Sequence, residues 1–484
     1  MSTAPQLTFR GGWTMAFIPV VIFVIFSVVY FVVLDAFDMT ALAAGGFIAL
    51  LVGALLARGY SKFWDAVIAG IGSATSVSIV MILVLVGMLG QLIKDSDVSA
   101  GFVWIADQAG LHGGGLTLFV FLACCLIAMA TGSSIGTMFT AFPIFYPAGV
   151  LLGADPAMLA GAIVSGAIFG DNLAPISDTT IISASTQRFR HKDGSADIGG
   201  VVTSRARYAL VAAALAGIGY LVFGGTGAGG TASVDLADQA DPRGLIMLAP
   251  VAALLLTAFL SRNIYLAVTV GLVLGTATAL LAGLLEPSGV LGVTEGAPTG
   301  YLVTGVSAML PTVALVIAVF GIMGVLRAAG VLERIVAALT EGRLAGTPRG
   351  AEAAIGLGVS ATTVLFGGVN SASMLTFGPV ADEIGARQGL HPYRRTNVMD
   401  CFAMGLSCVV PVFSAFLFIG AMLTAGHEQA PEISTTQLFG ATWYPLLLTV
   451  VLIVAVATGW GRRFEGPGGQ PVKRGEDVPA PAGA

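Results

Sequence analysis

Phe169-Gly170-Asp171-Asn172-Leu173-Ala174-Pro175-Ile176-Ser177-Asp178-Thr179-Thr180 places two carboxylates in a run that is otherwise apolar from residue 157 to about residue 184. A charged side chain at the depth of a lipid bilayer costs several kcal/mol, so two acids in one span need a reason. The glycine and the proline let a spanning helix unwind and turn backbone carbonyls towards a cavity. The stretch predicts a broken membrane helix with a cation site; the alternative is a polar kink that neighbouring helices satisfy.

The composition of the whole chain is that of a membrane protein. Of its 484 residues, 56 % are hydrophobic and 10 % are charged, whereas soluble proteins carry about 25 % charged residues. Apolar runs long enough to span a bilayer recur along the chain, beginning at Trp13–Leu34. The sequence contains no P-loop pattern, which excludes a nucleotide-driven pump for this chain alone. We expect the lipid bilayer as its environment, and neither a cofactor nor a nucleic-acid partner.

The pattern predicts an all-α polytopic fold built from two repeats. The predicted parts are an N-terminal cytoplasmic tail at 1–12, a first repeat at 13–224, an external acidic linker at 225–243, a second repeat at 244–460 and a disordered cytoplasmic tail at 461–484. The predicted spans or broken pairs cover residues 14–34, 41–58, 65–93, 114–131 with 133–150, 157–186, 207–224, 244–260, 263–283, 301–328, 351–384, 397–425 and 439–460.

Three short matches in the same order indicate the repeat. Residues 86–90 correspond to 320–324 with an offset of 234, residues 132–134 correspond to 367–371, and residues 170–175 correspond to 405–411. One glycine match would mean little in a glycine-rich membrane protein. Three ordered matches at a nearly constant offset favour a duplicated unit whose broken helices meet near the bilayer midplane.

The positions of the basic residues favour an inverted arrangement of the two repeats. If the pairs at 114–150 and 351–384 are re-entrant hairpins, each repeat crosses the membrane five times. All of the 22 lysines and arginines except Lys94 and Arg243 then lie on the side of the N-terminus. The positive-inside rule makes that side the cytoplasm, so both termini are predicted to be cytoplasmic in a cell membrane.

The two acids, Asp171 and Asp178, are the predicted cation and proton ligands. No lysine or arginine occurs in the cores of the four broken segments, so the pair suits a hard monovalent cation such as Na+, or protons, held by oxygen atoms. A buried carboxylate without a counter-charge holds a proton and releases it when a cation arrives, which is exchange chemistry. Further neutral ligands, or simply helix caps, are Asn172, Ser177, Thr179 and Thr180.

The hairpin tips are the predicted contacts for a transported solute. Small polar residues flanked by glycine can present N–H groups and hydroxyls there, or they can merely cap helices. These residues are Gly132, Ser133, Ser134, Gly368, Asn370 and Ser371. In the second broken span, Ser407 and Asp400 form a possible second-half site. Asp400 follows Arg394 and Arg395, so a salt-bridge role is an equal alternative.

The motifs at residues 131–137 and 170–180 resemble those of the NhaC family of Na+/H+ antiporters, within the ion transporter superfamily. The resemblance implies an inverted-repeat fold with a scaffold and a moving transport unit, commonly in a homodimer, and it matches Asp171 and Asp178 to the family's acids. Two departures from the motif are Asn172, where a lysine is common, and Ala174, where a serine is common. Similar proteins also include sodium-coupled carriers of small carboxylates and amino acids.

Three functions follow from these observations. The leading hypothesis is secondary Na+/H+ antiport, and the alternative in the same class is Na+- or H+-coupled transport of a small organic acid or amino acid. An intramembrane aspartyl protease using Asp171 and Asp178 is the remote alternative. It is disfavoured because both acids lie in one segment and residues 167–170 lack the Gly-x-Gly-Asp pattern.

Overall fold

The computed structural model describes residues 7–30, 34, 39–96, 98–175, 177–225, 242–261, 263–294, 296–331, 334, 343–411, 413–425, 427 and 430–473. About 77 % of this part is helical, and it also contains two short two-stranded antiparallel sheets. Five of its helices are long and apolar enough to cross a membrane, and a sixth span results if α21 (Thr435–Ala441) and α22 (Trp443–Thr458), bent by 52°, are taken together. The prediction of an all-α polytopic membrane protein is confirmed.

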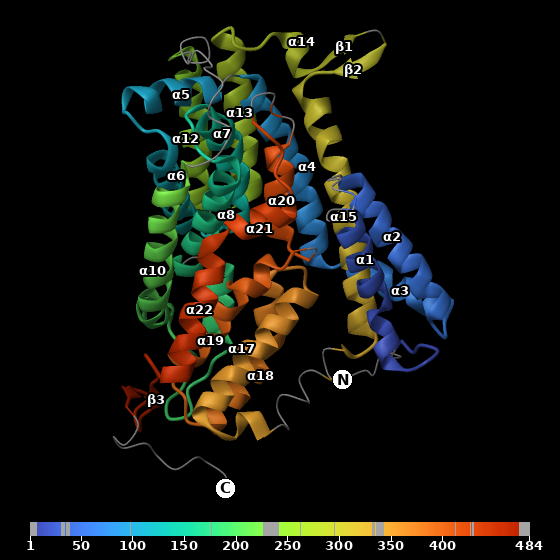
Figure 1. Cartoon of the computed structure of the whole chain (residues 1–484), viewed down its shortest axis with the longest axis vertical. Coiled ribbons are helices and arrows are strands. Elements are labelled where there is room, and N and C mark those ends of the chain that lie inside the picture. Colours follow the sequence, from blue (N-terminus) through green and yellow to red (C-terminus); the bar gives the residue numbers. More distant parts are fainter. Residues whose placement is uncertain are drawn as a thin grey trace.

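One group of helices forms the right-hand side of the molecule in Figure 1, around the long helix α15 (Tyr301–Ala328). Helices α2, α3 and α4 pack along it, and α1 packs on α2. Glycines allow the close approach: a Cβ atom at Gly70 of α3 would lie 2.2 Å from the Phe320 carbonyl oxygen of α15. The other bounds in this group are η1 Trp13–Phe17, α1 Ile18–Val28, α2 Met39–Leu56, α3 Tyr60–Ile71, α4 Ala74–Asp95, α14 Pro287–Val290, β1 Gly292–Thr294 and β2 Ala297–Thr299. Outside it, η3 Pro242–Met247 packs on α5 (Val98–Gln108), α12 Leu248–Ser261 contacts α6 (Gly113–Thr131) and α13, and α13 Ile264–Leu281 also contacts α4.

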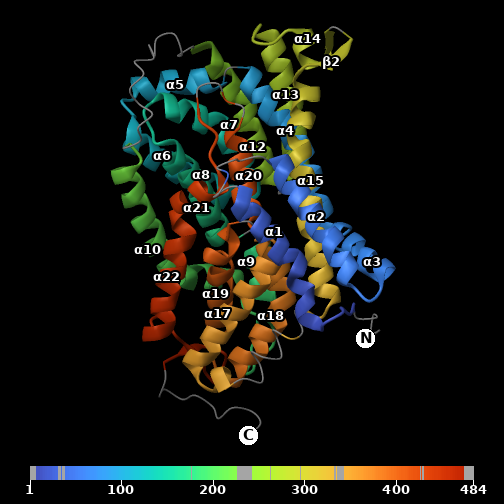
Figure 2. The same cartoon turned by 45° about the vertical axis from the view of Figure 1, so that its right-hand side comes forward.

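A second group contains both broken pairs and both broken spans, and it stands beside the first in Figures 1 and 2. Its centre is α8 (Pro156–Leu173), in which every residue from Leu159 to Leu173 is buried. A Cβ atom at Gly170 would lie 2.4 Å from the Cys125 carbonyl oxygen, so this glycine lets α8 lie directly on α6. The other bounds are α5 Val98–Gln108, α6 Gly113–Thr131, α7 Ser134–Leu151, α9 Asp178–Ser185, α10 Ile198–Phe223, η4 Arg343–Gly346, α17 Pro348–Leu365, α18 Asn370–Arg387, α19 Pro392–Ala403, η5 Leu406–Val409, α20 Ala415–Thr424, α21 Thr435–Ala441 and α22 Trp443–Thr458.

Two of the differences between the predicted spans and the observed helices come from helix caps. The span at 65–93 is divided into α3 and α4, because the chain breaks at Gly72 and Ser73 and the Ser73 hydroxyl caps α4. The span at 207–224 begins earlier, at Ile198, because the Asp197 carboxylate accepts a hydrogen bond of 2.7 Å from the Gly200 amide. Capping residues therefore set helix ends that hydropathy alone misplaces.

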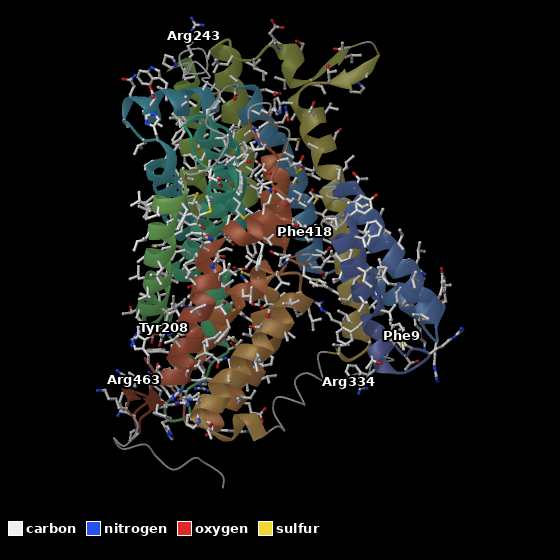
Figure 3. The ribbon with its side chains drawn as sticks, in the orientation of Figure 1. Phe9, Tyr208, Arg243, Arg334, Phe418 and Arg463 are labelled. Carbon is white, nitrogen blue, oxygen red and sulfur yellow. The ribbon has the colours of Figure 1, made fainter. Side chains whose placement is uncertain are left out.

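The order of helices agrees with two repeats, but the inversion of the second repeat stays a prediction. The broken pairs are α6 with α7 and α17 with α18, and α6 and α7 are each long enough to span on their own. Figure 3 places Arg243 at one end of the molecule and Arg334 and Arg463 at the other, as the predicted sidedness requires. Nearly all of the predicted linker at 225–243 lies outside the described residues.

The tail predicted to be disordered from residue 461 is ordered as far as residue 473. Strands β3 (Phe464–Glu465) and β4 (Pro471–Val472) form a small hairpin. The buried Glu465 carboxylate accepts hydrogen bonds from the amides of Arg190 and His191, at 2.7 and 2.8 Å. These hydrogen bonds of the buried Glu465 hold residues 464–472 against the rest of the protein, although the composition of the segment is typical of disorder. Residues 474–484 lie outside the described residues.

His391, just before α19, joins this hairpin to the helices and predicts a pH-dependent stability. Its Nδ1 accepts from the Tyr393 amide at 3.2 Å, so Nε2 carries the proton that binds the Gly469 carbonyl at 3.1 Å. Burial lowers the pKa of His391 to about 4, against about 6.5 when unfolded. The folded state binds fewer protons, so we expect a stability contribution that is complete above about pH 6.5 and falls by about 3 kcal/mol towards pH 4.

The measurement is the thermal unfolding midpoint of the wild type and of His391→Gln, at pH 7.5 and pH 5. The variant should be less stable at pH 7.5, and the gap between the two proteins should narrow at pH 5. A gap of the same size at both pH values would show that His391 is not the titrating group.

Candidate cation site

A cavity of about 190 Å³ lies where the two hairpin tips and the first broken span meet. All six predicted tip residues line it, together with Asp171, Asp178 and Thr179 of the broken span and the beginning of α20. Residues more than 230 positions apart in the chain thus surround one space. The lining residues are Gly132, Ser133, Ser134, Ile135, Asp171, Asp178, Thr179, Gly368, Val369, Asn370, Ser371, Ala415 and Phe416.

Asp171 is held at this cavity by the first hairpin. It lies in the last turn of α8 and is 5 % exposed. The hydroxyl of Ser134, the first residue of α7, donates to its Oδ2 at 2.8 Å, and the Ser177 hydroxyl donates to its Oδ1 at 2.5 Å. Because Ser177 is also the cap of α9, the carboxylate joins both sides of the break to the hairpin tip.

Asp178 is held by the second hairpin. It is the first residue of α9 and is exposed, unlike Asp171. The Ser371 hydroxyl, in the first turn of α18, donates to its Oδ2 at 2.5 Å, and the Thr179 amide donates to its Oδ1 at 2.8 Å. Each acid of the broken span therefore binds a serine of a different hairpin tip.

The electrostatics of the cavity favour a cation. Within the described residues, neither Asp171 nor Asp178 forms an ion pair with a basic side chain, and the hydrogen-bond donors to both are hydroxyls and one amide. The starts of α7, α9 and α18 supply partial positive charge near the acids, which stabilises the carboxylates without neutralising them. Two carboxylates with the hydroxyls of Ser134, Thr179 and Ser371 offer the oxygen ligands that Na+ prefers.

Several predicted site residues lie elsewhere. Asn172 and Thr180 are buried behind the cavity, where the Asn172 amide nitrogen donates to Asp400 Oδ1 at 2.8 Å. The Ser407 hydroxyl donates to the Phe402 carbonyl at 2.6 Å and is not among the lining residues. At the tip of the first hairpin, the Ser133 hydroxyl caps α7 by accepting from the Gly136 amide at 3.1 Å.

A buried arginine that the sequence pattern does not predict lies beside the site. Arg205 of α10 forms an ion pair with Asp400 at 2.7 Å, and both side chains are fully buried. The positive-inside rule predicts the cytoplasmic side for all of the basic residues at 188–207, Arg205 included. The signal that identifies Arg205 is the helix cap at Asp197, which starts α10 two turns earlier than hydropathy does. Asp400 is thus a salt-bridge partner, one of the two roles considered for it.

Comparison with known proteins gives related transporters. The chain is 35 % identical over 160 residues to the malate-2H+/Na+-lactate antiporter of Bacillus subtilis, a match covering 32 % of this chain and 33 % of that protein. It is 48 % identical over 59 residues to the Na+/H+ antiporter NhaC of Alkalihalophilus pseudofirmus, covering 12 % and 13 % of the two chains. These matches span about a third or less of each relative.

The match to a whole family is broader. The sequence profile of the Na+/H+ antiporter family matches residues 4–225 and 243–460, which is nearly the entire chain. It includes both hairpin tips and both broken spans, so the cavity lies wholly within the matched regions. The chain belongs to the Na+/H+ antiporter family.

Proposed function

We propose that this protein is a secondary transporter that exchanges Na+ for H+ through Asp171 and Asp178. The observation that carries the proposal is the meeting of both acids and both hairpin tips around one cavity, with no basic partner among the described residues. In this mechanism the two carboxylates hold Na+ on one side of the membrane and protons on the other. Because a buried carboxylate is unstable as an unpaired charge, Na+ release favours proton binding.

A second candidate is Na+- or H+-coupled transport of a small organic acid. Two observations favour it: the cavity of about 190 Å³ is larger than a single ion needs, and the first turns of α7 and α18 both line it. Helix N-termini bind carboxylates, and a bound Na+ would offset the charge of the acids. The name of the Bacillus relative, a malate-2H+/Na+-lactate antiporter, is consistent with this candidate.

The proposal includes the membrane arrangement. The protein lies in a cell membrane with both termini on the cytoplasmic side. The second repeat is inverted with respect to the first, and two copies of the chain form a homodimer. The opposite ends taken by Arg243 and by Arg334 and Arg463 support the sidedness. The family consists of antiporters, so the aspartyl protease alternative is set aside.

The test uses proteoliposomes with an imposed pH gradient and follows the lumenal pH as Na+, Li+ or K+ is added. We expect proton movement on Na+ addition, and a response about tenfold weaker in Asp178→Asn, because an exposed carboxylate loses part of its effect to solvent screening.

The same proteoliposome measurement distinguishes Na+/H+ exchange from transport of an organic acid. An intact protein without any proton response would contradict exchange. The second candidate would then be tested by Na+-driven uptake of radiolabelled small carboxylates and amino acids, including lactate and malate.

A further inference from the structure

The guanidinium of Arg205 is fully buried, and within the described residues its hydrogen bonds and its ion pair all end on oxygen atoms. Its Nη1 donates to the Asn172 carbonyl at 2.6 Å and to the Thr180 hydroxyl at 3.1 Å. Its Nη2 lies 2.7 Å from Asp400 Oδ2 and 3.4 Å from the Ser183 hydroxyl, and its Nε donates to Asn397 Oδ1 at 3.4 Å. The guanidinium therefore has five oxygen partners.

These oxygens come from both sides of the helix break and from the second repeat. The Asn172 carbonyl belongs to the last turn of α8, where the break leaves carbonyls without an intrahelical partner. Thr180 and Ser183 lie on α9, and the other two partners lie on α19. One carboxylate, two hydroxyls, one amide oxygen and one free carbonyl make up the kind of oxygen set that binds a monovalent hard cation.

We propose that Arg205 is a tethered cation that occupies a second cation site of this transporter, formed by the carbonyl of Asn172, the hydroxyls of Thr180 and Ser183, and Asp400. The guanidinium supplies permanently the charge that a Na+ ion would supply reversibly. Neither Arg205 nor Asp400 lines the cavity of Asp171 and Asp178, so the two sites are distinct. This inference goes beyond the exchange function and does not depend on it.

The ion pair between Arg205 and Asp400 affects which acids can take part in transport. Asp400 is neutralised in every state in which Arg205 stays in place, so only Asp171 and Asp178 remain to exchange ions. Asn172 follows Asp171 directly and donates to Asp400 Oδ1 at 2.8 Å, so the second site also fixes the end of α8 that carries the exchange site.

An ordinary structural salt bridge would behave differently from a tethered cation when the arginine is removed. In both cases a neutral residue at position 205 leaves a buried, unpaired carboxylate, which is strongly destabilising. If Arg205 is a tethered cation, the remaining oxygens form a site that Na+ can fill, because they already surround the position of the guanidinium. In an ordinary salt bridge they form no such site. Removing Arg205 should therefore create a Na+ requirement.

The experiment is made in the background Asp171→Asn/Asp178→Asn, so that Na+ binding in the exchange cavity does not contribute. Arg205→Ala, Arg205→Gln and Arg205→Lys are purified in NaCl and in choline chloride of equal ionic strength. The readouts are the thermal unfolding midpoint and the number of 22Na+ ions bound per protein.

We expect the alanine and glutamine variants to be less stable than the background in choline, to regain stability saturably with NaCl, and to bind one additional Na+. Arg205→Lys keeps a cation in the site and should show no such response. Adding Asp400→Asn to Arg205→Ala should abolish the Na+ effect.

Three results would overturn the proposal: neutral variants that bind no additional Na+, a Na+ effect that persists without Asp400, or neutral variants that cannot be recovered in either salt while Arg205→Lys folds. Recovery of the neutral variants in NaCl alone would support it. A failure of Na+/H+ exchange in the wild type is a separate result, since these measurements involve no proton movement.

Discussion

Asp171→Asn is expected to abolish Na+-driven proton movement in proteoliposomes while leaving the protein folded. Asp171 is buried and belongs to the cavity, so its charge acts on a bound cation with little screening. Two unit charges about 4 Å apart at an effective dielectric constant of about 20 interact with about 4 kcal/mol. Losing that interaction weakens Na+ binding roughly a thousandfold. Asparagine keeps the size of the side chain: its carbonyl oxygen can accept from one of the two serines, Ser134 or Ser177, and its NH2 group can donate to the hydroxyl oxygen of the other.

The matched control is Asp155→Asn, the same chemical change at the other end of α8. Asp155 caps the helix by accepting from the Met158 amide at 2.9 Å, and asparagine caps equally well. The control should keep the proton response of the wild type. If Asp171→Asn retained a normal response with an unchanged Na+ dependence, Asp171 would not be the ion ligand and the proposed mechanism would fail.

The sequence was sufficient to find the polar residues of the cavity because polar side chains next to a helix break in an apolar run are rare. Gly132 and Gly367 end their helices with positive φ angles of 66° and 65°, which favour glycine. In a membrane, the polar residues beside those breaks find hydrogen-bond partners only at a cavity or at another helix break. The prediction that both tips approach Asp171 and Asp178 followed from the repeat, and the structure brings them together.

The sequence was not sufficient to show how the polar residues pair. The Ser177 hydroxyl bonds to Asp171 while Thr180 bonds to Arg205, although both are equally polar and lie three residues apart. The partner of each residue depends on the direction in which its side chain points after the helix break. Hydropathy does not predict that direction. The same limit applies to Asp400, whose partner lies 195 positions away on α10.

Glu352→Gln is expected to lower the free energy of unfolding by about 3–5 kcal/mol, the cost of leaving buried charges without their partner. Glu352 of α17 is fully buried and receives two arginines. Arg394 of α19 donates to it at 2.7 and 3.1 Å, and Arg462, just after α22, donates at 2.9 and 2.6 Å. One carboxylate thus connects α17, α19 and the chain just after α22, and an amide cannot neutralise either guanidinium.

The control is Glu383→Gln, which removes an exposed carboxylate from its i,i+4 pair with Arg387. Exposed pairs of this kind contribute about 0–1 kcal/mol, so this variant should unfold close to the wild type when denaturation is followed in detergent. If the cost at Glu352 comes from unpaired charge, adding Arg394→Gln to Glu352→Gln should cost clearly less than the sum of the two single changes. Additive losses would mean instead that packing, and not the ion pair, connects α17 to α19. Because α17 leads into the second hairpin tip, a loss at Glu352 should also weaken transport by loosening the contact of Ser371, at the start of α18, to Asp178.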